Sequence, residues 1–90
     1  MEIKIEKPTD KQIESLGIKS WPIWTKEISG FPWTYDDKET CLILEGQVFV
    51  TPDGGEAVEI NVGDLVQFPA GMSCVWKITK DIRKHYRFGE

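Results

Sequence analysis

The chain has one histidine, His85, among its 90 residues, and only two cysteines, Cys41 and Cys74. A metal centre built on three histidines is therefore excluded by count. The two cysteines lie too far apart in the sequence for zinc-knuckle spacing. In the cytosol they would be reduced thiols, and a small buried hydrophobic residue is the default interpretation of each. No cofactor is predicted.

Long apolar runs and an excess of basic charge are also missing. The N-terminus alternates charged residues with Ile3 and Ile5, unlike a signal peptide, and no stretch approaches the roughly 20 apolar residues of a membrane span. The 15 acidic and 11 basic residues give a net charge of −4, which repels nucleic-acid phosphates. The basic cluster at residues 83–87 is short. We therefore expect a cytoplasmic protein that binds neither membranes nor nucleic acid.

Apolar material is plentiful, because 40% of the residues are hydrophobic and four are tryptophans. This composition argues against intrinsic disorder. The length predicts a single domain over residues 1–90, near the lower end of what folds alone. Since so small a chain buries a modest share of its surface, we also expect a homodimer on size grounds.

One segment has a helical pattern, and the rest is typical of strands and turns. Thr9 followed by Gln12 forms a capping-box signature, and Gly17 can end the last turn. Turn signals then interrupt short apolar runs at Gly30, Pro32 and residues 36–37, 45–46, 52–55, 61, 63–64, 69–71 and 80–81. This spacing predicts an all-β barrel or sandwich with one short N-terminal helix.

Alternation along the last strand assigns its two faces. Ile82, Lys84, Tyr86 and Phe88 share the apolar face, and Arg83, His85 and Arg87 share the other. An inward Lys84 needs a carboxylate partner, whereas a lysine at the barrel mouth would extend to water, and both alternatives stay open. His85 is predicted to be a surface residue without a role. Leu42 and Leu44, on the outward phase of their strand, are candidates for contact with a partner sheet or subunit.

Two spaced motifs carry a resemblance to a known superfamily. Glu39 precedes Gly46 by six intervening residues, and Gly63 precedes Pro69-Ala70-Gly71 by five. These resemble the two cupin motifs, at about 31–46 and 63–78, with a hairpin between them. The chain is most similar to the small cupins related to ureidoglycine aminohydrolase and to ethanolamine-utilisation cupins, the DUF861 or Cupin_3 type. The resemblance implies an RmlC-like jelly-roll β-barrel.

Further segments carry the closer resemblance: Phe31-Pro32-Trp33-Thr34-Tyr35, Leu44-Glu45-Gly46, Gly63-Asp64, Phe68-Pro69-Ala70-Gly71 and Arg83-Lys84-His85-Tyr86. Metal-binding cupins have histidines where this chain has Trp33, Tyr35 and Cys74, so Glu39 alone survives of the four implied ligands. Tryptophan does not ligate metals. We therefore predict no metal, with Glu39 and Cys74, and Tyr35 as phenolate, as the ligands of an atypical site if one exists.

The motif positions and the strand phases together indicate which side chains point into the barrel. They predict an aromatic pocket with one acid, one amine and two thiols. Its ligand-binding residues are Trp33, Tyr35, Glu39, Cys41, Cys74, Trp76, Lys84 and Tyr86. Such a mostly apolar pocket with a few polar groups is typical of small-molecule sites. The candidate catalytic residues are Glu39 and Lys84 as general base and acid, Tyr35, and Cys74.

Three functions remain open on the sequence. The first is a non-catalytic cupin that binds a small polar metabolite. The second is an enzyme, metal-independent or with an atypical metal, acting on a small nitrogen-containing metabolite, as the resemblance to ureidoglycine aminohydrolase implies. The third is a structural role in which the barrel merely dimerises. An interior filled by Trp33, Trp76 and Tyr86 would favour the third.

Overall fold

The computed structural model describes residues 2–89, of which the larger part is β-structure. A short helix and a 3-10 turn interrupt the first strands, as the prediction of an all-β fold with one N-terminal helix requires. In chain order the elements are β1 (Lys4–Glu6), α1 (Asp10–Leu16), η1 (Ile18–Ser20), β2 (Ile23–Lys26), β3 (Ser29–Thr34), β4 (Glu39–Pro52), β5 (Val58–Asn61), β6 (Leu65–Phe68) and β7 (Ser73–Phe88).

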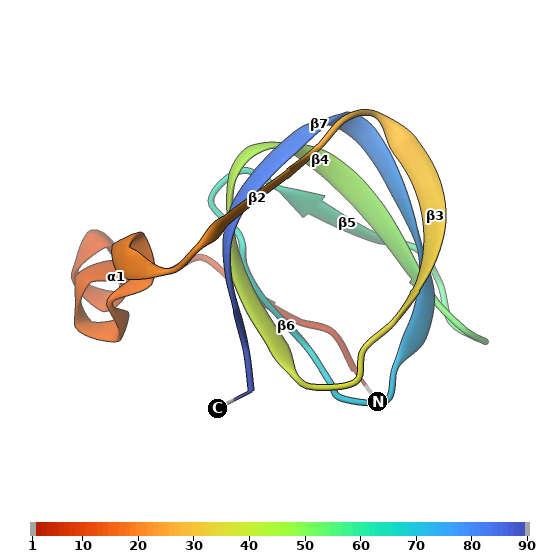
Figure 1. Cartoon of the computed structure of the whole chain (residues 1–90), viewed down its shortest axis with the longest axis horizontal. Helices are drawn as coiled ribbons and strands as arrows, with labels where there is room; N and C mark the ends of the chain where they lie inside the picture. The colour runs from red at the N-terminus through yellow and green to blue at the C-terminus, as the bar shows by residue number, and fades with distance from the viewer. Residues whose placement is uncertain (1, 90) are drawn as a thin grey trace.

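The strands form one curved antiparallel sheet that encloses an interior (Figure 1). Its strand order is β1-β6-β4-β7-β2, with β3 also paired to β7 and β5 to β4. The two long strands, β4 and β7, run side by side along much of their length and therefore carry residues of both halves of the barrel. This arrangement is consistent with a cupin jelly roll.

Two of the predicted turns are bends inside the long strands. The signals at residues 45–46 and 80–81 lie within β4 and β7, where the pairing register shifts around Glu45 and Gln47. Gly46 has φ of 98°, and a Cβ there would overlap the carbonyl oxygen of Asp81. The glycine thus permits a close strand crossing, and the prediction of separate strands was wrong because a bulge bends a strand without ending it.

Two other predicted breaks also lie inside a strand. Gly30 and Pro32 are both part of β3, in register with Lys77 and Val75 of β7. β3 pairs only with β7, so the missing N–H of the proline can face away from the ladder. Edge position explains why the proline signal failed here. The intermotif hairpin was predicted correctly: β4 pairs with β5 from Gln47 to Val50.

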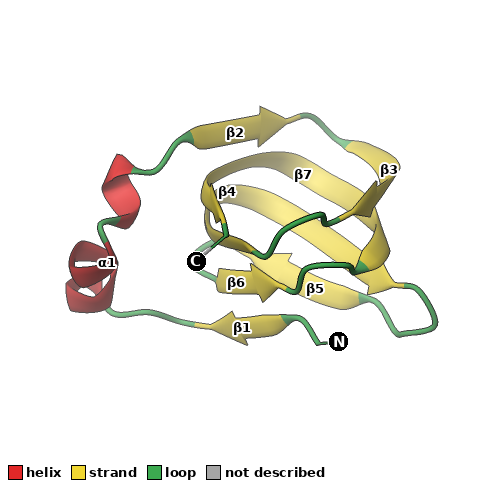
Figure 2. Cartoon of the chain, turned by 60° about the horizontal axis from the view of Figure 1, so that its bottom comes forward, coloured by secondary structure: helices red, strands yellow, loops and turns green. Residues whose placement is uncertain are grey.

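The helix has the predicted caps. Thr9 and Gln12 form a reciprocal capping box, and Gly17 ends the helix in the left-handed region at φ of 66°. The segment that contains α1 and η1 runs outside the barrel and connects β1 to β2 (Figure 2). We call residues 9–22 the N-terminal arm. No helix within residues 2–89 is long and apolar enough to cross a bilayer.

The arm covers the outer face of the sheet. Ile18, which is fully buried, forms a second apolar cluster with Leu42 and Leu65, and Leu44 packs against it. The prediction that Leu42 and Leu44 are exposed was therefore wrong. Their outward phase was correct, but the arm of the same chain packs on the face for which a partner sheet or subunit was a candidate.

His85 is covered in the same way. Its side chain faces outward, yet it is only 8% exposed, and Nδ1 lies 2.9 Å from the carbonyl oxygen of Trp21. The guanidinium of Arg87 lies over the Trp21 ring at 4.6 Å. The predicted surface histidine is thus a buried contact between β7 and the arm, which strand phase alone could not reveal.

Candidate functional site

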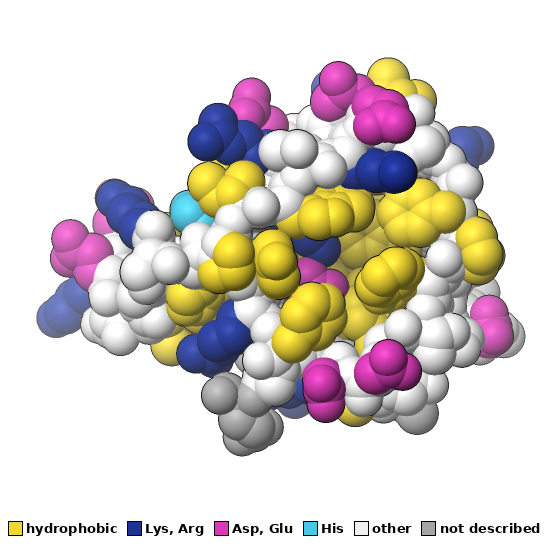
Figure 3. Space-filling model, viewed as in Figure 1, with side chains coloured by type: hydrophobic (Ala, Val, Ile, Leu, Met, Phe, Trp, Pro, Cys, Tyr) yellow, Lys and Arg dark blue, Asp and Glu magenta, His cyan; other side chains and the backbone are white. Residues whose placement is uncertain are grey.

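A cavity of about 180 Å³ opens into the barrel interior. The space-filling view shows it as a hollow rimmed by hydrophobic side chains, with basic and acidic atoms at its floor (Figure 3). Its walls are largely aromatic. The lining residues are Trp24, Phe31, Trp33, Tyr35, Glu39, Trp76, Lys84, Tyr86 and Phe88.

Strand register explains why aromatic side chains meet here. Phe31 lies opposite Trp76 on paired strands, and their rings stack at 6.0 Å with 17° between the planes. Trp24 lies opposite Lys84 in the pairing of β2 with β7. Directly opposed residues on one face of a sheet contact each other, so the register places both pairs on the cavity wall.

The polar centre of the cavity is the Glu39–Lys84 ion pair. Lys84 Nζ donates to Glu39 Oε2 at 2.6 Å, and the two side chains are 6% and 4% exposed. The ammonium group also lies 4.8 Å from the Trp24 ring and 4.6 Å from the Trp76 ring. Of the two alternatives for Lys84, the inward lysine with a carboxylate partner is the one observed. The cation is stabilised by both the carboxylate and the ring faces.

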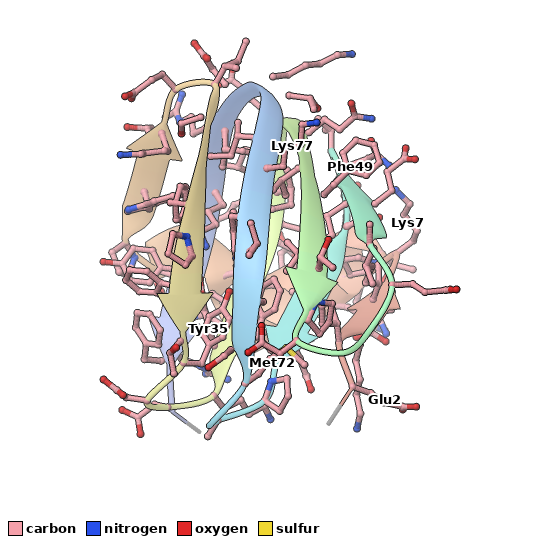
Figure 4. All side chains as sticks on the ribbon, turned by 90° about the vertical axis from the view of Figure 1, so that its right-hand side faces the viewer. Glu2, Lys7, Tyr35, Phe49, Met72 and Lys77 are labelled. Carbon is pink, nitrogen blue, oxygen red and sulfur yellow. The ribbon has the colours of Figure 1, made fainter. Side chains whose placement is uncertain are left out.

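Tyr35 contributes a hydroxyl group to the same wall. It is 1% exposed, and its oxygen accepts a hydrogen bond from Trp76 Nε1 at 3.1 Å. Burial, and next the nearby Glu39 carboxylate, raise the pKa of Tyr35 well above its ordinary value. Tyr35 and Met72 lie toward the same end of the barrel (Figure 4). The backbone of Tyr35 is fixed by its amide, which donates to the Met72 carbonyl at 2.9 Å. Tyr35 therefore stays a neutral hydroxyl that can donate to a ligand.

The two cysteines lie behind the cavity wall. Cys41 is fully buried, and Cys74 is 2% exposed with its thiol 3.6 Å from the Trp33 carbonyl oxygen. Burial raises the pKa of the Cys41 thiol to about 12, and it also raises the pKa of Cys74. A high pKa disfavours the thiolate, which is the nucleophile and metal ligand. Neither thiol is among the groups that line the cavity.

Six of the eight predicted ligand-binding residues line the cavity: Trp33, Tyr35, Glu39, Trp76, Lys84 and Tyr86. Cys41 and Cys74 do not. Trp24, Phe31 and Phe88 line it and were missed. Phe31 and Phe88 share the phase of predicted residues on their strands, so alternation could have found them. Trp24 lies in β2, whose residues are two apolar ones followed by two polar ones, so there is no alternation to indicate a face.

The donor set at the motif positions does not fit a metal ion. Within residues 2–89, no group of three or more histidine, cysteine or carboxylate side chains is arranged to hold one. At the motif positions, Trp33 presents an indole, and Glu39 is already bound by the ammonium of Lys84. Tyr35 is held as a neutral phenol. The Glu39 carboxylate therefore binds the buried ammonium of Lys84 at the position where metal-binding cupins use the glutamate as a ligand.

Comparison with known proteins agrees with the fold and with the motifs. Residues 13–86 match the EutQ-like cupin domain. A DUF861 family protein from Thermotoga maritima is 52% identical, with a TM-score of 0.95 over 97% of this chain and 99% of that one. The EutQ protein of Clostridium difficile is 21% identical, with a TM-score of 0.68 over 74% of this chain and 52% of that one.

No curated protein is significantly similar in sequence. The likeness to the C. difficile protein supports the fold alone, because the identity is low. The domain match, in contrast, spans most of the chain and includes both motifs. The chain therefore belongs to the family of EutQ-like cupin domains.

Proposed function

We propose that this cupin binds a small polar metabolite in the aromatic cavity, without the usual metal-binding histidines. The observation that carries the proposal is the nearly buried Glu39–Lys84 ion pair that lines an open cavity. A buried ion pair is a poor source of stability, because desolvation offsets the attraction. A pair that borders free volume can instead exchange part of its contacts with a ligand.

The cavity limits the size and charge of that ligand. Its volume of about 180 Å³ is below the roughly 300–1,000 Å³ of pockets that hold drug-sized ligands, so the ligand is a small molecule. Because the ion pair is already balanced, a ligand with net charge would lose hydration without compensation. A neutral or zwitterionic metabolite can accept from Tyr35 and donate to the Glu39 carboxylate while its apolar body packs on the rings.

The observation that favours an enzyme is the direct contact of an acid with an amine. Glu39 Oε2 and Lys84 Nζ are 2.6 Å apart, and the neutral Tyr35 side chain lines the same cavity. These three groups could transfer protons to or from a small nitrogen-containing metabolite, provided that it lies within hydrogen-bond reach. This is the second candidate function, and the cavity itself counts against a purely structural role.

Ligand-observed NMR with a panel of small metabolites tests the binding proposal. The matched control is the double variant Glu39→Gln/Lys84→Met, which removes both charges and keeps the aromatic walls. We expect saturation transfer to a subset of the panel with the wild type and none with the variant. Equal transfer with both proteins, or none with either, would contradict the proposal. Signals of new products over time would favour the enzyme.

Elemental analysis of untagged protein, before and after exposure to manganese, iron, nickel and zinc, tests the metal alternative. We expect no stoichiometric metal, because the cation of Lys84 already compensates the Glu39 carboxylate. Stoichiometric metal that is lost in a Glu39→Gln variant would replace the binding proposal with an atypical metal site.

A further inference from the structure

Lys84 is a buried amine at the floor of a cavity that a small molecule could enter. Its side chain is 6% exposed, whereas Lys77, on the same strand, is exposed. We propose that Lys84 forms a reversible imine with a small aldehyde or ketone in this cavity. The inference rests on the proposed binding of a small metabolite and adds the class of compound and a covalent step.

The surroundings of Lys84 suit the imine as well as the free side chain. An iminium carries its positive charge at the same nitrogen as an ammonium, so the Glu39 carboxylate and the rings of Trp24 and Trp76 stabilise both. Charge therefore does not change at the floor of the cavity when the adduct forms.

The step balances without any other reactant. The Lys84 ammonium passes a proton to the Glu39 carboxylate, and the neutral amine attacks the carbonyl carbon, opening its π bond. Tyr35 can donate a hydrogen bond to the carbonyl oxygen as negative charge develops there. Protons from the nitrogen, carried through Glu39, convert that oxygen to water, which leaves as the C=N bond forms. In sum, an ammonium and a carbonyl compound give an iminium and one water.

Geometry supports Glu39 as the proton carrier. Its Oε2 is 2.6 Å from Lys84 Nζ, within the distance at which a proton transfers directly. The small volume of the cavity, about 180 Å³, favours carbonyl compounds of a few carbon atoms. Since the ion pair is already balanced, a neutral aldehyde is a better probe than an anionic keto acid.

Reductive trapping tests the inference. The wild-type protein is incubated with limiting propanal and cyanoborohydride, which reduces iminium ions to stable amines, and peptide mass spectrometry then locates each added propyl group. Lys84→Arg is the matched variant, because arginine keeps the charge and the stacking without a nucleophilic amine. Lys77→Arg, on an exposed site of the same strand, is the control.

We expect the propyl group to appear first at Lys84, to be lost in Lys84→Arg, and to persist in Lys77→Arg. Glu39→Gln should slow trapping by about 100-fold, because a proton carrier is removed. Labelling of Lys84 no faster than of Lys77 in the wild type would overturn the inference, whether or not the Glu39 variant folds. If the metabolite panel binds while Lys84 stays unlabelled, only the covalent step fails, and the proposed binding function remains.

Discussion

Lys84 and His85 are neighbours on β7, and both are buried, but they face opposite sides of the sheet. Lys84 points into the barrel, where a carboxylate and two indole rings surround its charge beside free volume. His85 points outward and meets the backbone of Trp21 in the N-terminal arm. The same strand therefore carries a polar residue in a cavity and a polar residue in a sealed contact.

The difference lies in what completes the burial. On the outer face, the arm packs Ile18 against the sheet and places a carbonyl oxygen 2.9 Å from His85 Nδ1, so groups of the same chain cover both. On the inner face, the chain supplies the charges and the walls but leaves the volume open. Burial of a polar residue thus indicates a ligand site only where free volume accompanies it. The predictions below test this contrast.

The largest effect is expected at the ion pair. Replacing Glu39 with Gln leaves the buried ammonium of Lys84 without its carboxylate, which should lower the free energy of unfolding by about 4 kcal/mol. The variant should also lose binding of the panel metabolites. Urea denaturation followed by tryptophan fluorescence measures the stability, and ligand-observed NMR measures the binding.

The double variant Glu39→Gln/Lys84→Met separates the two consequences. Removing both charges should restore most of the lost stability, because buried pairs are often replaced by apolar groups with little cost. Binding should remain absent. If the double variant bound the metabolites like the wild type, the inner face would be no more functional than the outer one.

The next largest effect is expected on the outer face. Ile18→Ala would leave a cavity in the cluster under the arm, since Ile18 is fully buried, and should cost about 3 kcal/mol of unfolding free energy. Metabolite affinity should be unchanged. Leu16→Ala, at a position 46% exposed, is the control and should change stability by less than about 0.5 kcal/mol. A loss of affinity in Ile18→Ala would show that the two faces are coupled.

Much of the inner face could be predicted from the sequence. Alternation placed Lys84 and Tyr86 together, and motif spacing placed Glu39 and Trp33 beside them, because side-chain direction in a strand follows a period of two. The same rule could not decide between an inward ion pair and a lysine at the mouth. That choice depends on the register between β4 and β7, which brings Lys84 next to Glu39.

The outer face could not be predicted because it depends on a long-range contact. Nothing in the alternation around Leu42 or His85 indicates that residues before β2 fold back over them. The short helix was identified by its caps, but caps fix the ends of a helix and not the surface that it covers. Bends such as Gly46 were missed for a related reason: a glycine that permits a crossing has the same signal as one that forms a turn.

A smaller effect is expected at the cavity rim. Trp33 is 47% exposed and its ring meets that of Tyr35 edge-on at 6.4 Å, so Trp33→Ala should lower the unfolding free energy by about 1 kcal/mol. Loss of its ring contact should weaken metabolite binding by about 1 kcal/mol, or roughly fivefold. Titration by isothermal calorimetry gives the affinity. Val75→Ala, at a similarly exposed apolar position outside the cavity, should leave the affinity unchanged. Equal effects of the two variants would show that Trp33 does not contact the ligand.

The smallest effect near neutral pH is expected at Cys41, a fully buried thiol behind the cavity wall. Burial raises the pKa of Cys41 from 9.0 to about 12, so near neutral pH the folded protein should not react with iodoacetamide there. Because the folded state holds the proton more tightly, this contribution to stability is complete below about pH 9 and is lost as the pH rises toward 12. The alkaline decrease in unfolding free energy should therefore be smaller in Cys41→Ala. Cys74 is the internal comparison in this labelling experiment. Rapid labelling of native Cys41 would show instead that the ligand-accessible cavity extends behind the wall defined by Glu39 and Lys84.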